Sequence, residues 1–168
     1  MSDAPVGYGY TPAEHCRTVA RFVDRLGLRN LTVMGQDWGG PIGLGFAGRW
    51  PELVTRFVLG NTFAWPLDDV TRVRLFSAVM GGPVGRAGTW LFNLSPRFFI
   101  ARGFARPLPP AVKTAYMARW QDRRRRGPAA IAPHELIHAR EFLREVEAAL
   151  PRLADRPSML LTDDLQIR

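Results

Sequence analysis

A chain of 168 residues, 46% of them hydrophobic, is long enough to form one domain with a core, and no run in it reaches the roughly 18 apolar residues of a membrane span. The single cysteine excludes an internal disulfide framework, and the first residues lack the basic and apolar regions of a secretory signal. We therefore expect a cytoplasmic protein without a membrane partner.

The net charge of +8 is distributed unevenly along the chain. Residues 70–130 contain twelve basic residues and one acid, Asp122, and they include the run Arg123–Arg126. Such a segment can contact nucleic acid, but no aromatic residues alternate with this run and no nucleic-acid motif accompanies it. We interpret the segment as a solvated face and expect no nucleic-acid partner.

The first predicted element is a helix over residues 12–26. Thr11 suits the N-cap, Pro12 suits the first helical position, and Glu14 completes a capping box. Gly27 is a natural stop at the other end. Apolar residues recur between them at helical spacing and predict one buried face: Val19, Phe22, Val23 and Leu26.

Two short apolar strands are predicted at residues 31–34 and 57–59, with a helix over residues 41–49 between them. Continuous apolarity predicts burial of both strand faces, as in a parallel sheet. The glycines at 43, 45 and 48 weaken an isolated helix but suit close packing against a sheet. This alternation of helix and strand predicts an α/β fold.

The composition changes after Pro66, where helical patches and many Gly and Pro residues occur without a convincing strand. Strand character returns at residues 157–161. We therefore divide the chain into a core over residues 1–65, a helical insertion over residues 66–150 and a return to the core over residues 151–168.

The segment GQDWGG, residues 35–40, follows the first strand and precedes a helix. Gly-x-nucleophile-x-Gly at such a turn is the nucleophile elbow, which lifts its central residue, here Asp37, above the carboxyl edge of the sheet. We expect Gly35 and Gly39 to be required by the tight turn. A carboxylate there can attack carbon directly and leave an ester that water hydrolyses. The alternative is that Asp37 only caps the helix.

The runs GQDWGGPIG and VTRFVLGNTFAWP, residues 35–43 and 54–66, resemble haloalkane dehalogenases of the α/β-hydrolase superfamily. The runs GYGYTPAEH and LPRLADRPSMLL fit the same family in the same order. The resemblance implies a partial α/β-hydrolase fold, a parallel sheet with a helical cap inserted. It further implies that Asp37 displaces halide from an sp³ carbon and that Trp38 donates its indole N–H to the halide. The implied partners are a small halogenated hydrocarbon, water and the halide product, without a cofactor.

Some parts of the family pattern have no counterpart in this sequence. The second halide-binding residue, the early strands and the late catalytic His are not found, so we expect a chain truncated at both ends. For the catalytic acid, Asp164 is the best match and Asp163 the next.

The three histidines do not fill the catalytic role. His15 lies in the first predicted helix. His134 and His138 are four residues apart, a spacing that invites a metal interpretation, but we find no third ligand and expect no metal site.

Two alternative functions stay open. Epoxide hydrolases also use an Asp at the elbow, but they usually carry His where this chain has Gln36, and they have paired cap tyrosines where it has only Tyr116. The chain could also be a non-catalytic remnant, as the missing ends suggest. The sequence does not predict an oligomeric state.

Overall fold

The computed structural model describes residues 4–104 and 106–162. The chain forms two compact units. We call the part up to Pro66 together with the part from Ala139 the sheet unit, and Leu67–His138 the helical unit. Within the described residues no helix is both long enough and apolar enough to cross a membrane.

Helix α1, Pro12–Arg25, begins where the sequence predicts and ends one residue earlier, with Leu26 as its C-cap. The Thr11 hydroxyl accepts a hydrogen bond from the Glu14 N–H at 3.3 Å. The Glu14 carboxylate reaches further back than a capping box requires and accepts from the Gly9 N–H at 2.6 Å. Gly27 has a φ of 60°, as expected for a residue that ends a helix.

The sheet unit contains a three-stranded sheet in the order β1-β2-β3. Its strands are β1, Leu31–Asp37, β2, Val54–Thr62, and β3, Ser158–Leu161. Both pairings are parallel, so the predicted α/β class is confirmed. The register of β1 and β2 shifts between Gln36 and Asp37, and this irregularity pairs Asp37 with Thr62 at the carboxyl edge of the sheet.

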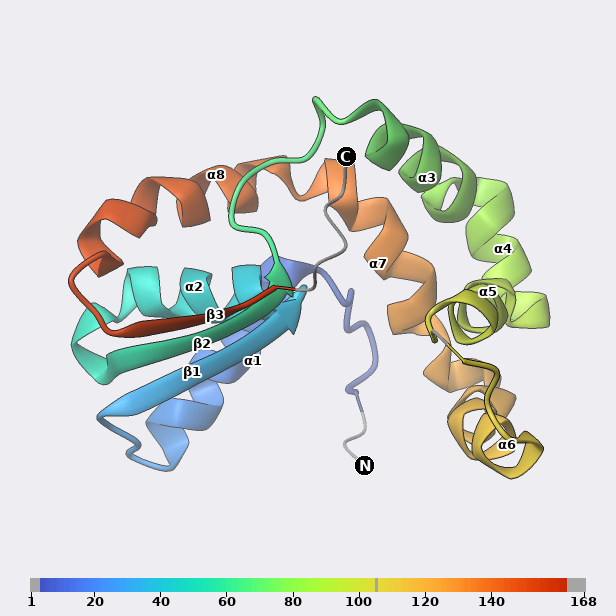
Figure 1. The fold of residues 1–168 in the computed structure, drawn as a ribbon, viewed down its shortest axis with the longest axis horizontal. Coiled ribbons are helices and arrows are strands. Elements are labelled where there is room, and N and C mark those ends of the chain that lie inside the picture. Colours follow the sequence, from blue (N-terminus) through green and yellow to red (C-terminus); the bar gives the residue numbers. More distant parts are fainter. Residues whose placement is uncertain (1–3, 105, 163–168) are drawn as a thin grey trace. The chain divides into compact units, whose positions relative to one another are not determined.

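Helix α2, Gly39–Arg49, lies against β1 and β2 and between α1 and α8, Arg140–Ala149 (Figure 1). The short helices η1, Pro51–Leu53, and η4, Leu150–Leu153, follow α2 and α8. The buried core of this unit is formed mainly by apolar side chains from these elements: Cys16, Val23, Leu44, Phe46, Val54, Phe57, Phe142, Leu143, Val146 and Leu153.

The glycines of α2 allow neighbouring elements to approach closely. A Cβ added at Gly43 would lie 2.5 Å from the Val33 side chain of β1, as expected for packing against a sheet. One added at Gly48 would lie 2.6 Å from the Cβ of Ala149, so this glycine faces α8 instead.

The expectation that both strand faces are buried is wrong for the described residues. Met34, in the first of the two predicted strands, is 78% exposed. The packed helices contact alternate positions of β1, and because successive side chains of a strand point to opposite faces, the other positions stay open to solvent.

The last part of the helical insertion expected over residues 66–150 forms two helices, α7, Gly127–His138, and α8. Four side chains of α8 are buried, and a Phe142 ring atom comes within 2.9 Å of the Cβ position at Gly45 of α2. Helix α8 therefore belongs to the sheet unit, and the boundary expected at residue 150 lies at His138.

The helical unit has no strand among its described residues. Its elements are α3, Thr71–Gly81, α4, Pro83–Phe92, α5, Leu94–Arg102, α6, Pro110–Ala118, η2, Arg119–Gln121, η3, Arg123–Arg125, and α7.

One arginine of the basic run contradicts the expectation of a solvated face. Arg126 is only 6% exposed. Its guanidinium donates to the backbone carbonyls of Trp90, Leu91, Trp120 and Gln121. Because the last carbonyls of a helix lack partners within it, this side chain stabilises the end of α4.

Candidate active site

The candidate site is the turn between β1 and α2 at the carboxyl edge of the sheet. Asp37 ends β1 with a φ of 50°, in the left-handed region that few non-glycine residues adopt. Its carbonyl accepts a hydrogen bond from the Thr62 hydroxyl at 2.6 Å. The unusual backbone of Asp37 is therefore held by the last residue of the neighbouring strand.

Steric crowding at the turn requires glycine at two positions, and one of them differs from the expectation. A Cβ at Gly35 would lie 2.6 Å from the Gly39 carbonyl oxygen, and one at Gly40 would collide with the Thr62 side chain. A Cβ at Gly39 would meet no heavy atom within 4 Å. The expected requirement at Gly39 is therefore wrong, and Gly40 takes its place because Thr62 packs against it.

The carboxyl group of Asp37 has an unusual electrostatic setting. Residue 37 keeps contact with solvent, yet the protein atoms around its carboxyl raise its pKa above the ordinary value by disfavouring the charged form. The Trp38 backbone N–H donates to this carboxyl, which lowers the pKa by a smaller amount. An incompletely solvated carboxylate is chemically more reactive than one fully in water.

Asp37 does not occupy the N-cap position of α2, which the capping alternative requires. Trp38, not Asp37, is the N-cap residue of this helix, and the Trp38 side chain makes no capping hydrogen bond. The Trp38 indole is half-buried against the core and meets the Phe63 ring edge-on, with the centroids 5.0 Å apart. Asp37 and Trp38 therefore sit together where the sequence places them.

The predicted acid Asp164, and its alternative Asp163, lie outside the described residues. His15 lies in α1, with its Nδ1 3.0 Å from the Tyr8 hydroxyl. The residue that sequence reasoning missed is Thr62. The only signal for it is its position at the end of the second parallel strand.

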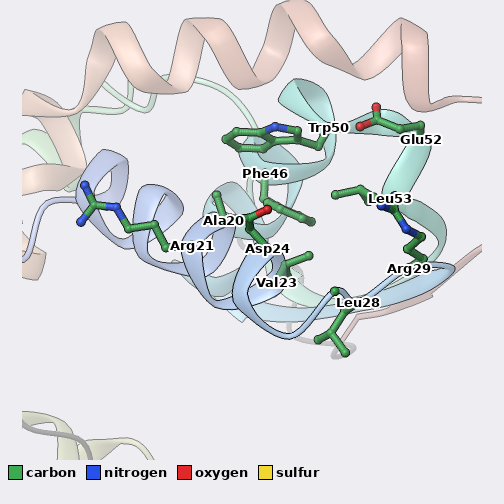
Figure 2. Close-up of a pocket in the computed structure, with 11 residues that line it drawn as sticks. Ala20, Arg21, Val23, Asp24, Leu28, Arg29, Phe46, Trp50, Glu52 and Leu53 are labelled. Atoms are coloured by element: carbon green, nitrogen blue, oxygen red, sulfur yellow. The ribbon is translucent and has the colours of Figure 1, made fainter.

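A cavity of about 400 Å³ opens between α1 and the corner formed by α2 and η1 (Figure 2). Phe46 and Trp50 line it together with Val23, and charged residues such as Arg29 and Glu52 lie at its rim. These residues precede β1 and β2, so the cavity is at the opposite end of the strands from Asp37. It is not part of the candidate site.

The sequence matches the family described as alpha/beta hydrolase fold over residues 2–135. The chain belongs to this family. The predicted partial α/β-hydrolase fold is thereby confirmed.

Curated relatives make the resemblance more specific. Haloalkane dehalogenase 2 of Mycobacterium tuberculosis is 34% identical over 162 residues, which cover 96% of this chain and 56% of that protein. A cis-3-alkyl-4-alkyloxetan-2-one decarboxylase of Xanthomonas campestris is 31% identical over 169 residues, with coverage of 94% and 55%. The resemblance to haloalkane dehalogenases is confirmed, and the chain spans little more than half the length of these relatives.

Solved structures agree on the fold. The haloalkane dehalogenase DatA from Agrobacterium tumefaciens aligns with a TM-score of 0.83 and 24% identity, covering 96% of this chain and 59% of that one. DbeA from Bradyrhizobium elkani aligns with a TM-score of 0.73 and 23% identity, covering 96% and 58%. At this identity the likeness establishes the architecture alone.

Proposed function

We propose that this chain carries the nucleophile of a haloalkane dehalogenase and that the turn between β1 and α2 is its nucleophile elbow. The observation that supports this most is Asp37 itself. Its carboxyl stands at the carboxyl edge of a parallel sheet, on a left-handed backbone, directly before the N-terminus of α2. The similarity to a curated dehalogenase supplies the substrate class.

In the proposed first step, a carboxylate oxygen of Asp37 forms a bond to the carbon that bears the halogen. The carbon–halogen bond breaks at the same time, and its electron pair leaves with the halide. The indole N–H of Trp38 donates to the departing halide, because indole is a donor only and stabilises negative charge as it develops.

In the proposed second step, water attacks the carbonyl carbon of the ester, which releases an alcohol and regenerates Asp37. The backbone N–H of Trp38, which donates to the Asp37 carboxyl, is placed to stabilise the oxyanion. Asp164 remains the residue proposed as the catalytic acid of the family pattern. The helical unit is the proposed cap that shapes the substrate pocket.

The two steps can be tested separately on the full chain with 1-bromobutane. We expect bromide release together with a butyl ester on Asp37, detected by mass spectrometry of the peptide that contains residues 31–49. Asp37→Asn removes the adduct. Trp38→Phe slows its formation on the order of 100-fold, as expected when one donor to developing charge is lost. Asp24→Asn, in the exposed part of α1, is the matched control and leaves the adduct unchanged.

If the folded chain forms no ester and releases no halide across a panel of short bromo- and iodoalkanes, the proposal is wrong and the chain is a non-catalytic member of the fold. An ester that accumulates without turnover would instead show a working nucleophile without an efficient hydrolytic step.

A second candidate function comes from the 31% identical oxetanone decarboxylase. Incubation with a cis-3,4-dialkyl-oxetan-2-one, followed by measurement of carbon dioxide, tests it. Diol formation from styrene oxide tests the epoxide hydrolase alternative in the same way. Either product, formed without halide release from bromoalkanes, would replace the dehalogenase proposal.

A further inference from the structure

The last turns of α7 carry His134, Glu135 and His138 in the pattern H-E-x-x-H. Metal-dependent hydrolases use this pattern to place two imidazoles on one face of a helix. The expectation of no metal site rests on the lack of a third ligand and overlooks the fact that Glu135 completes this pattern. All three residues lie within the helical unit.

The two imidazoles are already next to each other. Their ring centroids are 3.6 Å apart, and the ring planes differ by 15°. Both imidazoles therefore lie side by side on one face of α7.

Each ring has a backbone carbonyl beside it that fixes its tautomer. The Nδ1 of His138 lies 2.8 Å from the carbonyl oxygen of His134 and donates to it in the neutral ring. The Gly81 carbonyl hydrogen-bonds the His134 imidazole. When one ring nitrogen donates to a carbonyl, the other carries the free lone pair, which is the form that binds a metal.

Packing between α3 and α7 holds this arrangement. A Cβ at Gly81 would lie 2.5 Å from the Cα of His134, so the two helix backbones touch at this point. The Ser77 hydroxyl also donates to the His134 carbonyl at 3.3 Å. The His134 imidazole is therefore attached to two closely packed helices, and this reduces the conformational entropy that is lost when an ion binds.

We propose that His134 and His138 together bind a late first-row divalent ion such as Zn²⁺, Ni²⁺ or Cu²⁺, with water in the remaining positions. Imidazole nitrogen is a preferred ligand for these ions and a poor one for Mg²⁺ or Ca²⁺. The Glu135 carboxylate beside the pair offsets the positive charge of Arg86, which also lies close.

The described residues contain no group of three or more His, Cys, Asp or Glu side chains arranged to hold a metal ion. The site is therefore a two-histidine site that exchanges its ion. It is separate from the proposed chemistry at Asp37.

Isothermal titration of the full chain with Ni²⁺ and Zn²⁺ tests the proposal. We expect one bound ion per chain and a rise in melting temperature, because an ion that binds only the folded state stabilises it. His134→Asn and His138→Asn should each weaken binding by about tenfold or more, since loss of one ligand breaks the chelate. His15→Asn, at the third histidine, is the matched control and leaves binding unchanged, and Mg²⁺ should not bind.

Electron paramagnetic resonance of the Cu²⁺ complex adds a direct readout, in which coupling to two imidazole nitrogens is expected. His138 is exposed, so His138→Asn should keep the fold and its melting temperature without metal. Binding that survives both single replacements, that is lost with His15→Asn, or that does not occur would overturn the proposal.

Discussion

The left-handed backbone of Asp37 costs an L-residue about 1–2 kcal/mol, and a glycine would avoid that cost. The Thr62 hydroxyl partly offsets this cost by donating a short hydrogen bond to the Asp37 carbonyl. The carboxyl adds a second cost, because burial raises its pKa above the ordinary 3.8. Asp37 therefore lowers the free energy of unfolding of the chain, as is common where a reactive group must be held in place.

Asp37→Asn should therefore raise the melting temperature at pH 7. Because its pKa is raised, the Asp37 carboxyl binds more protons in the folded than in the unfolded chain between the ordinary pKa of 3.8 and the higher folded pKa. Its contribution to stability is therefore fully present below 3.8 and is lost as pH rises through the folded pKa. Asparagine lacks this titration and also tolerates the left-handed region. The advantage of the variant should be largest near neutral pH and shrink below about pH 4, in melts followed by circular dichroism.

Glu52→Gln, at an exposed acid of the same unit, is the control for this pH series. Its melting temperature should follow that of the unmodified chain at each pH. A variant that melts below the unmodified chain at pH 7, or an advantage independent of pH, would contradict the assigned cause.

Helix α2 shows how an element can be weak alone and well suited to its surroundings. Five of its eleven residues are glycine, a composition that disfavours an isolated helix. Eight of its residues are buried, and Gly43 and Gly48 let it approach β1 and α8 closely. Packing rather than intrinsic propensity therefore stabilises this helix.

Gly48→Ala should destabilise the chain by about 1 kcal/mol, because overpacking against Ala149 costs about 1–3 kcal/mol while the gain in helix propensity is about 1 kcal/mol. Gly39→Ala is the same substitution in the same helix at an open position and should change stability by less than about 0.5 kcal/mol. Urea unfolding of both variants measures the difference. Equal midpoints would show that α8 does not pack on α2 in this way.

At the scale of the whole molecule, each unit contains an arginine whose carbonyl partners all come from the same unit. All four carbonyls that Arg126 contacts lie in the helical unit, as does Arg126. Arg156 does the same in the sheet unit, where it donates to the carbonyls of Pro51, Val54 and Arg152. Each unit thus has the internal contacts expected of a separate folding unit.

Residues 67–138, expressed alone, should therefore keep a helical circular dichroism spectrum and unfold cooperatively. Arg126→Lys in this fragment should lower its stability by about 2 kcal/mol or more, because lysine cannot reach four carbonyls and those carbonyls are costly to leave unpaired. Arg124→Lys, with a side chain 92% exposed, is the control and should be neutral. A fragment that is unfolded would show that the sheet unit is needed to complete it.

The sequence predicts features that depend on neighbours along the chain. The capping residues of α1, its glycine stop, the parallel strands and the Asp37 turn all follow from local patterns, and the structure contains each of them. The described part of the chain also reproduces the absence of strands in the helical unit. These features are readable because propensity, periodicity and turn chemistry act over only a few residues.

Only the tertiary structure decides which distant residues meet. Thr62 reaches the Asp37 carbonyl because the register of two parallel strands shifts just before they end. Helix α8 joins the sheet unit because the glycines of α2 leave room for Phe142 and Ala149. The sequence predicts that Arg126 is one of four exposed arginines. It is buried instead, because backbone carbonyls from distant segments accept hydrogen bonds from it. Long-range contacts leave no periodic signal in the chain, so local identity and spacing alone do not determine them.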